Sequence, residues 1–446
     1  MESTSTYSMR EGEKAMFTSV KQQIRRETLA TVLDYYDKSI RNLSEAARDE
    51  KYNKMSATPF SFFRGSSHLF YYDFAKVPLA FDTDASHPTF IQGDLHFENF
   101  GVFEDGAGTI IYDVNDFDEA YLGSYLFDVL RMAISVDLFA AESGFDATRA
   151  IETYADTYAR AIERYANGKD EDVQFTKANT CKAIKKVIKK AEKKKDAFMA
   201  ERTEVRDEER YFATSDDLVP VSPKTAKQIK QAWPDYLSSL SEKHRHHADH
   251  YKIKDIAIKR ESGTASIGLE RYYILIEGAD EEHDEDIILE MKQAQSAVPS
   301  LFLPTHPLFE DGLSHQGARV IAAQRAMVHS RDPYLGYLTI DGNEYYVRQR
   351  SPYKRKVKAK HIKNEESLIE TLKVQAEITA KIHARADADA NVLDYEASER
   401  IAAAIGVSRP LFIRQITRWS QFYANQVRFD FEAFQTWLTT RSETHV

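Results

Sequence analysis

The sequences Gly93-Asp94-Leu95-His96-Phe97-Glu98-Asn99-Phe100-Gly101 and Asn115-Asp116-Phe117-Asp118-Glu119-Ala120 contain the most informative polar residues of this chain. Each follows a short apolar or β-branched run, residues 89–92 and residues 109–112, bounded by glycine or aspartate. Such runs are typical of strands. The two groups of carboxylates are therefore expected in loops at the ends of two strands.

These residue types suit phosphoryl transfer. That reaction needs an aspartate that orients the attacking hydroxyl, an asparagine that holds magnesium, and a second aspartate that bridges the metal and the phosphates. Asp94, Asn99 and Asp116 supply this set at the right separations, with a structural network of Asx turns as the alternative. Asp118 and Asp113 are further candidate metal ligands; the alternative, and the more common role of such aspartates, is to stabilise a turn or to support the ligands from outside.

His96 is a second catalytic candidate, because it can bond Asp116 or a phosphate; the alternative is that it only orders its loop.

A second group of candidates lies near residue 260, where the pattern changes from helix to three strands, residues 255–261, 271–276 and 287–294. The loop between the first two strands carries Gly263, Ser266 and Gly268, and such loops expose backbone N–H groups to phosphate oxygens.

Lys292 on the third strand is expected to place a point charge at the phosphates of a nucleotide. After it come a helix over residues 316–328, a hairpin of residues 337–340 and 344–350, and a long helix over residues 367–385. Arg348 of the hairpin and Arg385 are candidate phosphate clamps, and salt-bridge partners otherwise.

The rest of the chain is expected to be mainly helical. Residues 18–48 and 124–167 have helical periodicity, residues 59–65 read as an aromatic turn, and residues 168–250 look helical and polar. Arg64 in the aromatic turn either contacts an anion or packs on aromatic rings. The basic run 182–195 is expected to be a solvated face, with a phosphate or acidic partner second, and the histidines between residues 244 and 250 are expected to be solvated.

Composition narrows the function classes. The 446 residues have a formal charge of −10, which argues against a dedicated nucleic-acid binder. A single cysteine, Cys181, leaves no disulfide framework, and neither a signal peptide nor a long apolar run is found. We therefore expect a cytoplasmic protein with no membrane partner.

The acid motifs also resemble a known group of enzymes. Asp94 and Asn99, with Asp116, Gly123 and Asp128, stand as in the catalytic loop, metal site and following helix of aminoglycoside and choline phosphotransferases, which are relatives of protein kinases. This resemblance implies that ATP and Mg²⁺ are the cofactors and that Asp128 bonds the backbone of the catalytic loop. The loop departs from that pattern at Gln92, where the phosphotransferases usually have histidine.

Over residues 55–390 the chain is similar, more narrowly, to an uncharacterised bacterial domain family. The motifs that carry this similarity are Phe63-Arg64-Gly65, Asn99-Phe100-Gly101, Asn115 to Glu119, Met291-Lys292-Gln293-Ala294, Tyr346-Val347-Arg348-Gln349 and His383-Ala384-Arg385. The similarity implies no settled substrate.

The order of the motifs is unusual, because kinases place the glycine loop and the strand lysine before the catalytic loop. The resemblance therefore implies an α+β, two-lobed, protein-kinase-like fold that is circularly permuted, with a small antiparallel β lobe and a larger helical lobe. Its expected parts are residues 1–55, a helical extension; 56–250, the catalytic part with a helical insert at about 168–250; 251–350, the nucleotide lobe; and 351–446, returning helices.

One kinase feature is absent from the pattern. Kinases pair the strand lysine with a glutamate on the next helix, but residues 316–328 offer Gln324 and no acid. Either Glu290 or another residue takes that role, or Lys292 is held differently. The leading hypothesis is an ATP- and magnesium-dependent phosphotransferase that acts on an unidentified hydroxyl. The alternatives are a nucleotide-binding pseudokinase or AMP-transferring enzyme on the same fold and, with less support, a two-metal phosphoesterase.

Overall fold

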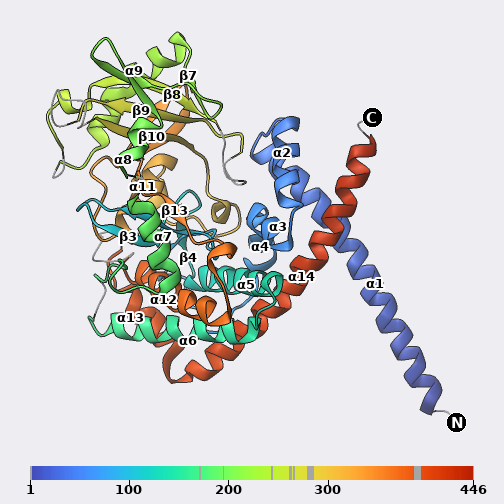
Figure 1. The fold of residues 1–446 in the computed structure, drawn as a ribbon. Helices are drawn as coiled ribbons and strands as arrows, with labels where there is room; N and C mark the ends of the chain where they lie inside the picture. Colours follow the sequence, from blue (N-terminus) through green and yellow to red (C-terminus); the bar gives the residue numbers. More distant parts are fainter. Residues whose placement is uncertain are drawn as a thin grey trace. The chain divides into compact units, whose positions relative to one another are not determined.

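The computed structural model of the protein describes residues 3–169, 172–193, 195–242, 245–260, 264, 267–278, 286–385 and 393–444. The chain divides into two compact units. Unit 1 comprises Met1–Phe74, Gly263–Gly268 and Phe422–Val446, and unit 2 comprises Ala75–Ser262 and Leu269–Gln421. Figure 1 shows the ribbon and labels many of its helices and strands.

Unit 1 is helical and packs through aromatic side chains. It contains α1 (Ser3–Tyr35), a π-helical turn (Tyr36–Ile40), α2 (Glu45–Met55), α3 (Pro59–Gly65), α4 (Ser67–Phe74) and the end of α14 (Arg409–Thr444). Tyr52 of α2 and Phe62 of α3 lie 5.8 and 5.0 Å from the ring of Phe434 in α14, measured between ring centroids. The single helix predicted over residues 18–48 is thus interrupted, and a new helix begins at Glu45 behind the capping Ser44.

The aromatic turn predicted at residues 59–65 is wrong, because these residues form helix α3. The Thr58 hydroxyl caps this helix by accepting a hydrogen bond from the Ser61 N–H at 3.1 Å, and Pro59 fills the first turn, where a missing N–H costs nothing. Arg64 lies 5.6 Å from the ring centroid of Phe60. Arg64 therefore packs on an aromatic ring, which was one of its two predicted roles.

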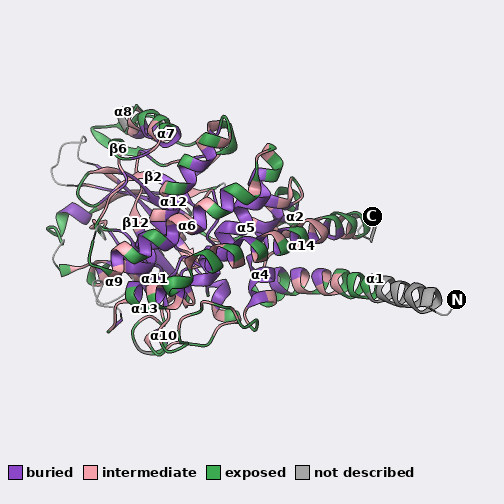
Figure 2. Ribbon diagram, turned by 90° about the horizontal axis from the view of Figure 1, so that it is seen from below, coloured by how far each residue is buried: buried purple, intermediate pink, exposed green. Residues whose placement is uncertain are grey.

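The helical part of unit 2 contains α5 (Tyr125–Ser143), α6 (Ala147–Ala166), α12 (Glu365–Arg385), α13 (Ala397–Ile405) and the start of α14. The two helices predicted within residues 124–167 and the long helix predicted at 367–385 are confirmed. Most residues of α5 are buried, as the purple ribbon in Figure 2 shows. A helix buried on nearly all sides can hold polar side chains in fixed positions, and Asp128 and Arg131 of α5 are both fully buried.

Two small antiparallel sheets lie beside these helices. Strand β1 (Thr89–Ile91) pairs with β4 (Tyr121–Gly123), and β2 (Phe100–Glu104) pairs with β3 (Ile110–Val114) and β13 (Arg355–Lys356). Strands β1 and β3 were predicted. Strand β2, which directly follows the first acid loop, was not.

A larger sheet of unit 2 has six antiparallel strands in the order β11-β12-β10-β9-β8-β7. They are β7 (Leu218–Pro220), β8 (Ile253–Lys259), β9 (Arg271–Ile276), β10 (Ile287–Ala294), β11 (Gly336–Ile340) and β12 (Asn343–Gln349). The predicted three-stranded meander and the later hairpin are both confirmed. Between them lies α11 (Gln316–Met327), which confirms the helix predicted at 316–328.

Alternation along β10 separates the two faces of this sheet. Leu289 and Met291 join a core with α9 (Pro223–Ser239), whereas Glu290 and Lys292 point to the opposite face. Figure 1 shows α9 and α11 on opposite sides of the sheet. The charged side chains of β10 are therefore presented on the side of the sheet where α11 lies.

The prediction that residues 168–250 are helical is wrong in part. This segment contains α7 (Lys182–Glu192), α8 (Lys195–Ala200) and α9, but also the hairpin of β5 (Thr203–Arg206) and β6 (Glu209–Phe212), and β7. β5 and β6 are short and mostly polar, and β7 has only three residues, so these strands lack the alternation that identifies longer strands. Asp207 and Glu208, with φ of 49° and 64°, form the turn between β5 and β6.

The expectation that the histidines near residue 250 are solvated is wrong for His250, which is 6 % exposed. His250 Nε2 lies 2.9 Å from the Tyr334 hydroxyl, and its ring stacks on His246 at 4.1 Å. His244 lies outside the described residues. Burial, followed by the charge of His246, lowers the pKa of His250 from 6.5 to about 4.

The lowered pKa of His250 predicts acid sensitivity. Below pH 6.5 the unfolded chain binds this proton more readily than the folded chain, so the contribution of neutral His250 to stability is complete above pH 6.5 and is lost towards pH 4. We expect His250→Phe, which keeps an aromatic ring but does not titrate, to flatten the fall of the thermal midpoint between these pH values by on the order of 5 °C. Thermal unfolding followed by circular dichroism from pH 8 to pH 4 measures this, and parallel curves for parent and variant would contradict it.

The architecture is thus mixed α+β with antiparallel sheets, which confirms the predicted α+β class. No helix in the described part of the chain is both long and apolar enough to cross a membrane.

Candidate active site

The loop that starts at Gln92 is held by the buried carboxylate of Asp128 in the first turn of α5. Asp128 Oδ2 accepts a hydrogen bond from the Gln92 N–H at 2.6 Å, and Oδ1 accepts one from the Gly93 N–H at 3.0 Å. His383 Nε2, near the end of α12, lies 3.2 Å from Oδ2. The expectation that Asp128 bonds the backbone of this loop is confirmed, and the carboxylate fixes the entry to the loop.

Asp94 lies inside the fold and is 7 % exposed. Its Oδ1 accepts a hydrogen bond from Arg131 Nη2 at 2.5 Å, and the Arg131 side chain is completely buried. The Asp94 backbone is also held, because its N–H donates to Gln92 Oε1 at 3.0 Å and its carbonyl accepts from Asn99 Nδ2 at 2.8 Å. The position of this carboxylate is therefore well determined.

The two acid stretches of the sequence come together at Gly93. This residue has φ +84°, and a Cβ there would lie 1.9 Å from the carbonyl oxygen of Glu119. Only glycine permits that approach. Gln92 Nε2 also donates to the Asp116 carbonyl oxygen at 2.7 Å, so the loops with Asp94 and Asp116 are in direct contact.

Asn99 and Asp116 keep ligand atoms available. Asn99 donates from Nδ2 to the Asp94 carbonyl oxygen, and its own backbone carbonyl accepts from the Asn115 N–H at 3.2 Å. The side-chain oxygen Oδ1 of Asn99 makes no hydrogen bond within the described ranges. The Asp116 carboxylate makes no hydrogen bond or ion pair to any described residue. His96 is 2 % exposed, and its Nδ1 accepts from the Glu98 N–H at 3.1 Å, a bond that orders the loop.

The β sheet contributes Lys292 to this acid cluster. Lys292 Nζ forms an ion pair with Asp118, two residues after Asp116, and the Tyr346 hydroxyl of β12 donates to the other oxygen of Asp118 at 2.8 Å. Burial alone would raise the pKa of Asp118, but the charge and hydrogen bond of Lys292 outweigh it and lower the pKa to about 2. Asp118 is therefore a partner of Lys292, whose pairing the sequence left open.

Glu290 does not take that role. It accepts two hydrogen bonds from Arg348, at 2.8 and 3.0 Å, and Arg271 lies 3.8 Å away. Burial opposes ionisation of Glu290, but the positive charges of Lys354, Arg348 and Arg271 hold its pKa well below the usual range. Arg348, a candidate phosphate clamp, thus forms a salt bridge in this structure.

Two further candidates are ion-paired. Arg385 Nη1 lies 2.6 Å from Asp172 Oδ1. Arg385 thus forms a salt bridge, which was the alternative to its role as a phosphate clamp. Asp113, a candidate metal ligand in the sequence, forms a buried ion pair with Lys381 of α12.

Arg319 of α11 is a residue of the site that sequence analysis missed. It is 1 % exposed, and its guanidinium donates to the carbonyl oxygens of Ala120 at 2.5 Å, Asp118 at 2.9 Å and Gln295 at 2.9 Å. The helix therefore holds the backbone of the second acid loop against the end of β10. No local pattern marks this role, because an arginine on a helix is usually exposed.

We expect Arg319→Lys to lower the free energy of unfolding by about 2 kcal/mol, because the three donors of an ammonium share one nitrogen and lack the fork with which Arg319 reaches carbonyl groups from both terminal nitrogens. Arg325→Lys on the same helix is the matched control, since among the described residues Arg325 donates to one carbonyl, that of Leu335, at 2.7 Å. Urea denaturation of both variants measures the difference. If both variants lost the same free energy of unfolding, the contacts of Arg319 to the acid loop would stabilise the fold no more than the single hydrogen bond of Arg325.

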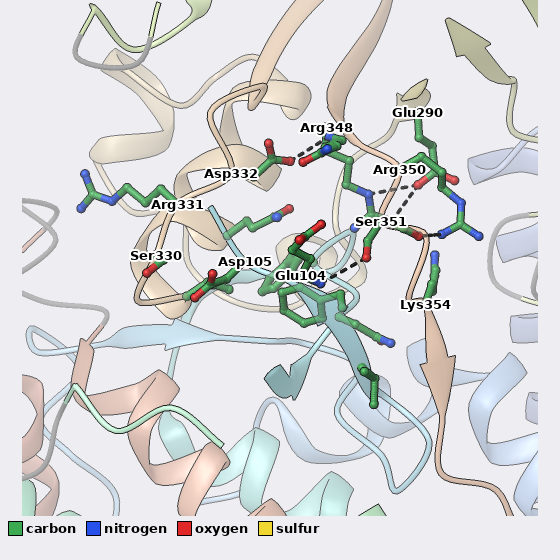
Figure 3. A pocket seen from close by; sticks show the side chains of 17 residues that line it. Glu104, Asp105, Glu290, Ser330, Arg331, Asp332, Arg348, Arg350, Ser351 and Lys354 are labelled. Carbon is green, nitrogen blue, oxygen red and sulfur yellow. Dashed lines mark hydrogen bonds and ion pairs between the residues drawn. The ribbon is translucent and has the colours of Figure 1, made fainter. Parts of the chain in front are cut away.

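A cleft adjoins the acid cluster. Its empty space is ≈ 670 Å³, part of it open to solvent. It is lined by Val102, Phe103, Glu104, Asp105, Asn115, Phe117, Glu290, Gln324, Val328, Ser330, Arg331, Asp332, Arg348, Gln349, Arg350, Ser351 and Lys354. Figure 3 shows Arg348, Arg350 and Ser351 at the end of β12 across from Glu104 and Asp105 of the β2–β3 hairpin.

Two buried carboxamides line this cleft without partners. Both residues are only 8 % exposed. Three of their side-chain atoms make no hydrogen bond to the residues that the structure describes: Asn115 Oδ1, Asn115 Nδ2 and Gln324 Oε1. Buried polar groups normally find a partner. Asn115 and Gln324 are therefore available to a bound molecule.

The glycine loop is only partly described. Gly263 and Ser266 lie outside the described residues. Gly268 belongs to unit 1, has φ +83°, and a Cβ there would lie 2.5 Å from Leu43 Cδ2. Within the described ranges, no three His, Cys, Asp or Glu side chains gather as a metal site made of these residue types alone.

Comparisons with known proteins bear on the family alone. No curated protein and no solved structure matches this chain. One family does match, over residues 43–436, which is most of the chain. The chain belongs to the bacterial family described as "Uncharacterized protein conserved in bacteria (DUF2252)".

Proposed function

We propose that this chain is an ATP- and Mg²⁺-dependent phosphotransferase with a protein-kinase-like, circularly permuted arrangement, acting on a hydroxyl-bearing acceptor. The observation that carries the proposal is the contact of Lys292 with Asp118. The neighbouring carboxylate of Asp116 has no partner among the described residues. A lysine from a β sheet next to a metal aspartate is the arrangement with which kinases hold the phosphates of ATP.

Each residue would have a definite role. Asp94 would accept the proton of the attacking hydroxyl, and its fixed backbone and bond to Arg131 orient its carboxylate. The free oxygens of Asn99 and Asp116 suit magnesium, which prefers oxygen ligands and would neutralise charge on the phosphates. Lys292 would contact the phosphates while it remains beside Asp118.

The residues that line the cleft also suit a nucleotide. The carboxamides of Asn115 and Gln324 offer donors and acceptors to a base, and Phe117 and Val102 add apolar surface. Arg350 adds positive charge.

The circular permutation is supported by the position of α12. The Thr89 hydroxyl at the start of β1 donates to the carbonyl oxygen of His383 at 2.9 Å, although the two residues are 294 positions apart. The end of α12 therefore adjoins the strand that leads to Asp94. In a kinase of ordinary order, a helix in that place precedes the catalytic loop directly.

Thermal-shift measurements with ATP, ADP, AMP and GTP, each with and without Mg²⁺, test the proposal. We expect ATP with Mg²⁺ to raise the thermal midpoint, because a ligand that binds only the folded state stabilises it by about 2.7 kcal/mol at a hundredfold excess over its Kd. Asp116→Asn should remove the magnesium-dependent part of that shift. If no nucleotide raises the midpoint in either condition, the proposal is wrong.

A second function on the same fold is favoured by one observation. Lys292 pairs with Asp118 of the acid loop and not with an acid on α11, unlike an ordinary kinase. A nucleotide-binding pseudokinase or an AMP-transferring enzyme accommodates this difference. Mass spectrometry of the product separates the cases, since a phosphoryl group, an adenylyl group and no addition differ in mass.

A further inference from the structure

Helix α7 presents a row of lysines on one face. These are Lys182, Lys185, Lys186, Lys189, Lys190 and, at the end of the helix, Lys193. The opposite face, with Ala183, Ile184, Val187, Ile188 and Ala191, is buried. At 1.5 Å rise per residue the row is about 16 Å long.

The lysines of this row are not neutralised by acids that the structure describes. None of the six forms an ion pair with a described residue. The one acid on α7, Glu192, is bound to Lys177 at 2.8 Å. A row of this kind on an ordinary solvated helix usually alternates with acids at helical spacing.

A second basic segment, far away in sequence, lies next to α7. Helix α7 contacts β13, the strand that contains Arg355. Burial lowers the pKa of His361, and the charges of Lys190 of α7 and of Lys360, Arg355 and Lys358 lower it further. Arg355, Lys358 and Lys360 also form no ion pair with a described residue. We call these three residues and the six lysines of α7 the basic face.

The residue types of the basic face restrict its partner. Lysine is a hydrated point charge, whereas recognition of single phosphates or carboxylates usually relies on the fork of arginine. No large apolar side chain in the described part of residues 182–193 and 355–363 is exposed. The basic face therefore lacks both the apolar anchors that strengthen membrane binding and the aromatic platforms on which unpaired bases stack.

We infer that the basic face binds the phosphate backbone of a double-stranded nucleic acid without reading its bases. Such contacts need only a row of cations along a linear array of phosphates. The net charge of −10, which argued against a nucleic-acid binder, is an average over the whole chain. Within a Debye length of about 8 Å the local cations dominate. This inference is independent of the proposed phosphotransferase activity.

The test is fluorescence anisotropy of the full chain with a labelled duplex of about 20 base pairs at several salt concentrations, since log Kd should then change linearly with log salt. The variant is Lys186→Gln/Lys189→Gln/Lys190→Gln. The matched control is Lys224→Gln/Lys227→Gln/Lys230→Gln, which removes the same charge from exposed positions of another helix, α9. Both variants keep long polar side chains that suit a helix.

We expect the parent to bind the duplex at about 50 mM salt, and the variant in α7 to bind at least about tenfold more weakly, with a salt slope smaller by about 3. The control should remain within about twofold of the parent. The inference is overturned if the parent does not bind, or if the two variants lose the same affinity. Tighter binding to single-stranded DNA, polyglutamate or phosphatidylserine vesicles than to the duplex would overturn it as well.

Discussion

Replacement of Asp94 by asparagine is expected to lower the rate of ATP turnover about a thousandfold, while the affinity for the nucleotide with Mg²⁺ stays within about twofold of the parent. Asparagine has nearly the same shape, and the backbone bonds of residue 94 to Gln92 and Asn99 do not depend on its side chain. What asparagine cannot do is accept a proton. The loss should therefore fall on the chemical step and not on binding.

The measurements are the initial rate of ADP formation, with water as the acceptor where no other is known, and the Kd of the nucleotide from calorimetry. Glu98→Gln is the matched control, because it removes a carboxylate from the same loop at a position with no proposed role in the reaction. Thermal unfolding must accompany both, since Asp94→Asn leaves the buried Arg131 beside a neutral partner. A variant with parental turnover would remove Asp94 from the mechanism, and a variant that has lost nucleotide binding would give Asp94 a structural role.

Much of this site followed from local sequence signals. The spacing of Asp94, Asn99 and Asp116 around two short strands is a short-range pattern, and the loops that carry them are in contact through Gln92. The meander that carries Lys292 was recognisable from its alternation alone. The role of Asp128 followed from the resemblance to phosphotransferases.

The remaining features depend on contacts between distant segments. Lys292 and Asp118 are 174 residues apart, and no spacing rule connects them. The burial of Arg319 is decided by three carbonyl oxygens that meet only in the folded chain. Helix α3, by contrast, was missed although its signal was present, since Thr58 followed by Pro59 is a usual start of a helix.

The largest effect on stability is expected from Lys381→Met. Lys381 and Asp113 have side chains that are 0 % and 2 % exposed, so the substitution leaves a carboxylate buried without its counter-charge. Removal of one partner of a buried ion pair costs about 3–5 kcal/mol. For a chain of this size we expect the thermal midpoint to fall by roughly 3–5 °C.

Two further variants separate the loss of the ion pair from other causes. Lys373→Met, at an exposed position of the same helix, should change the stability by less than about 0.5 kcal/mol. The double variant Lys381→Met/Asp113→Leu removes both charges and should recover most of the loss, because two apolar side chains can replace a buried pair at little cost. If the double variant were no more stable than Lys381→Met alone, the loss would come from altered packing of α12 against β3. Recovery would instead show that the pair holds α12 beside the strand that leads to Asp116, so that stability and the geometry of the candidate active site depend on the same contact.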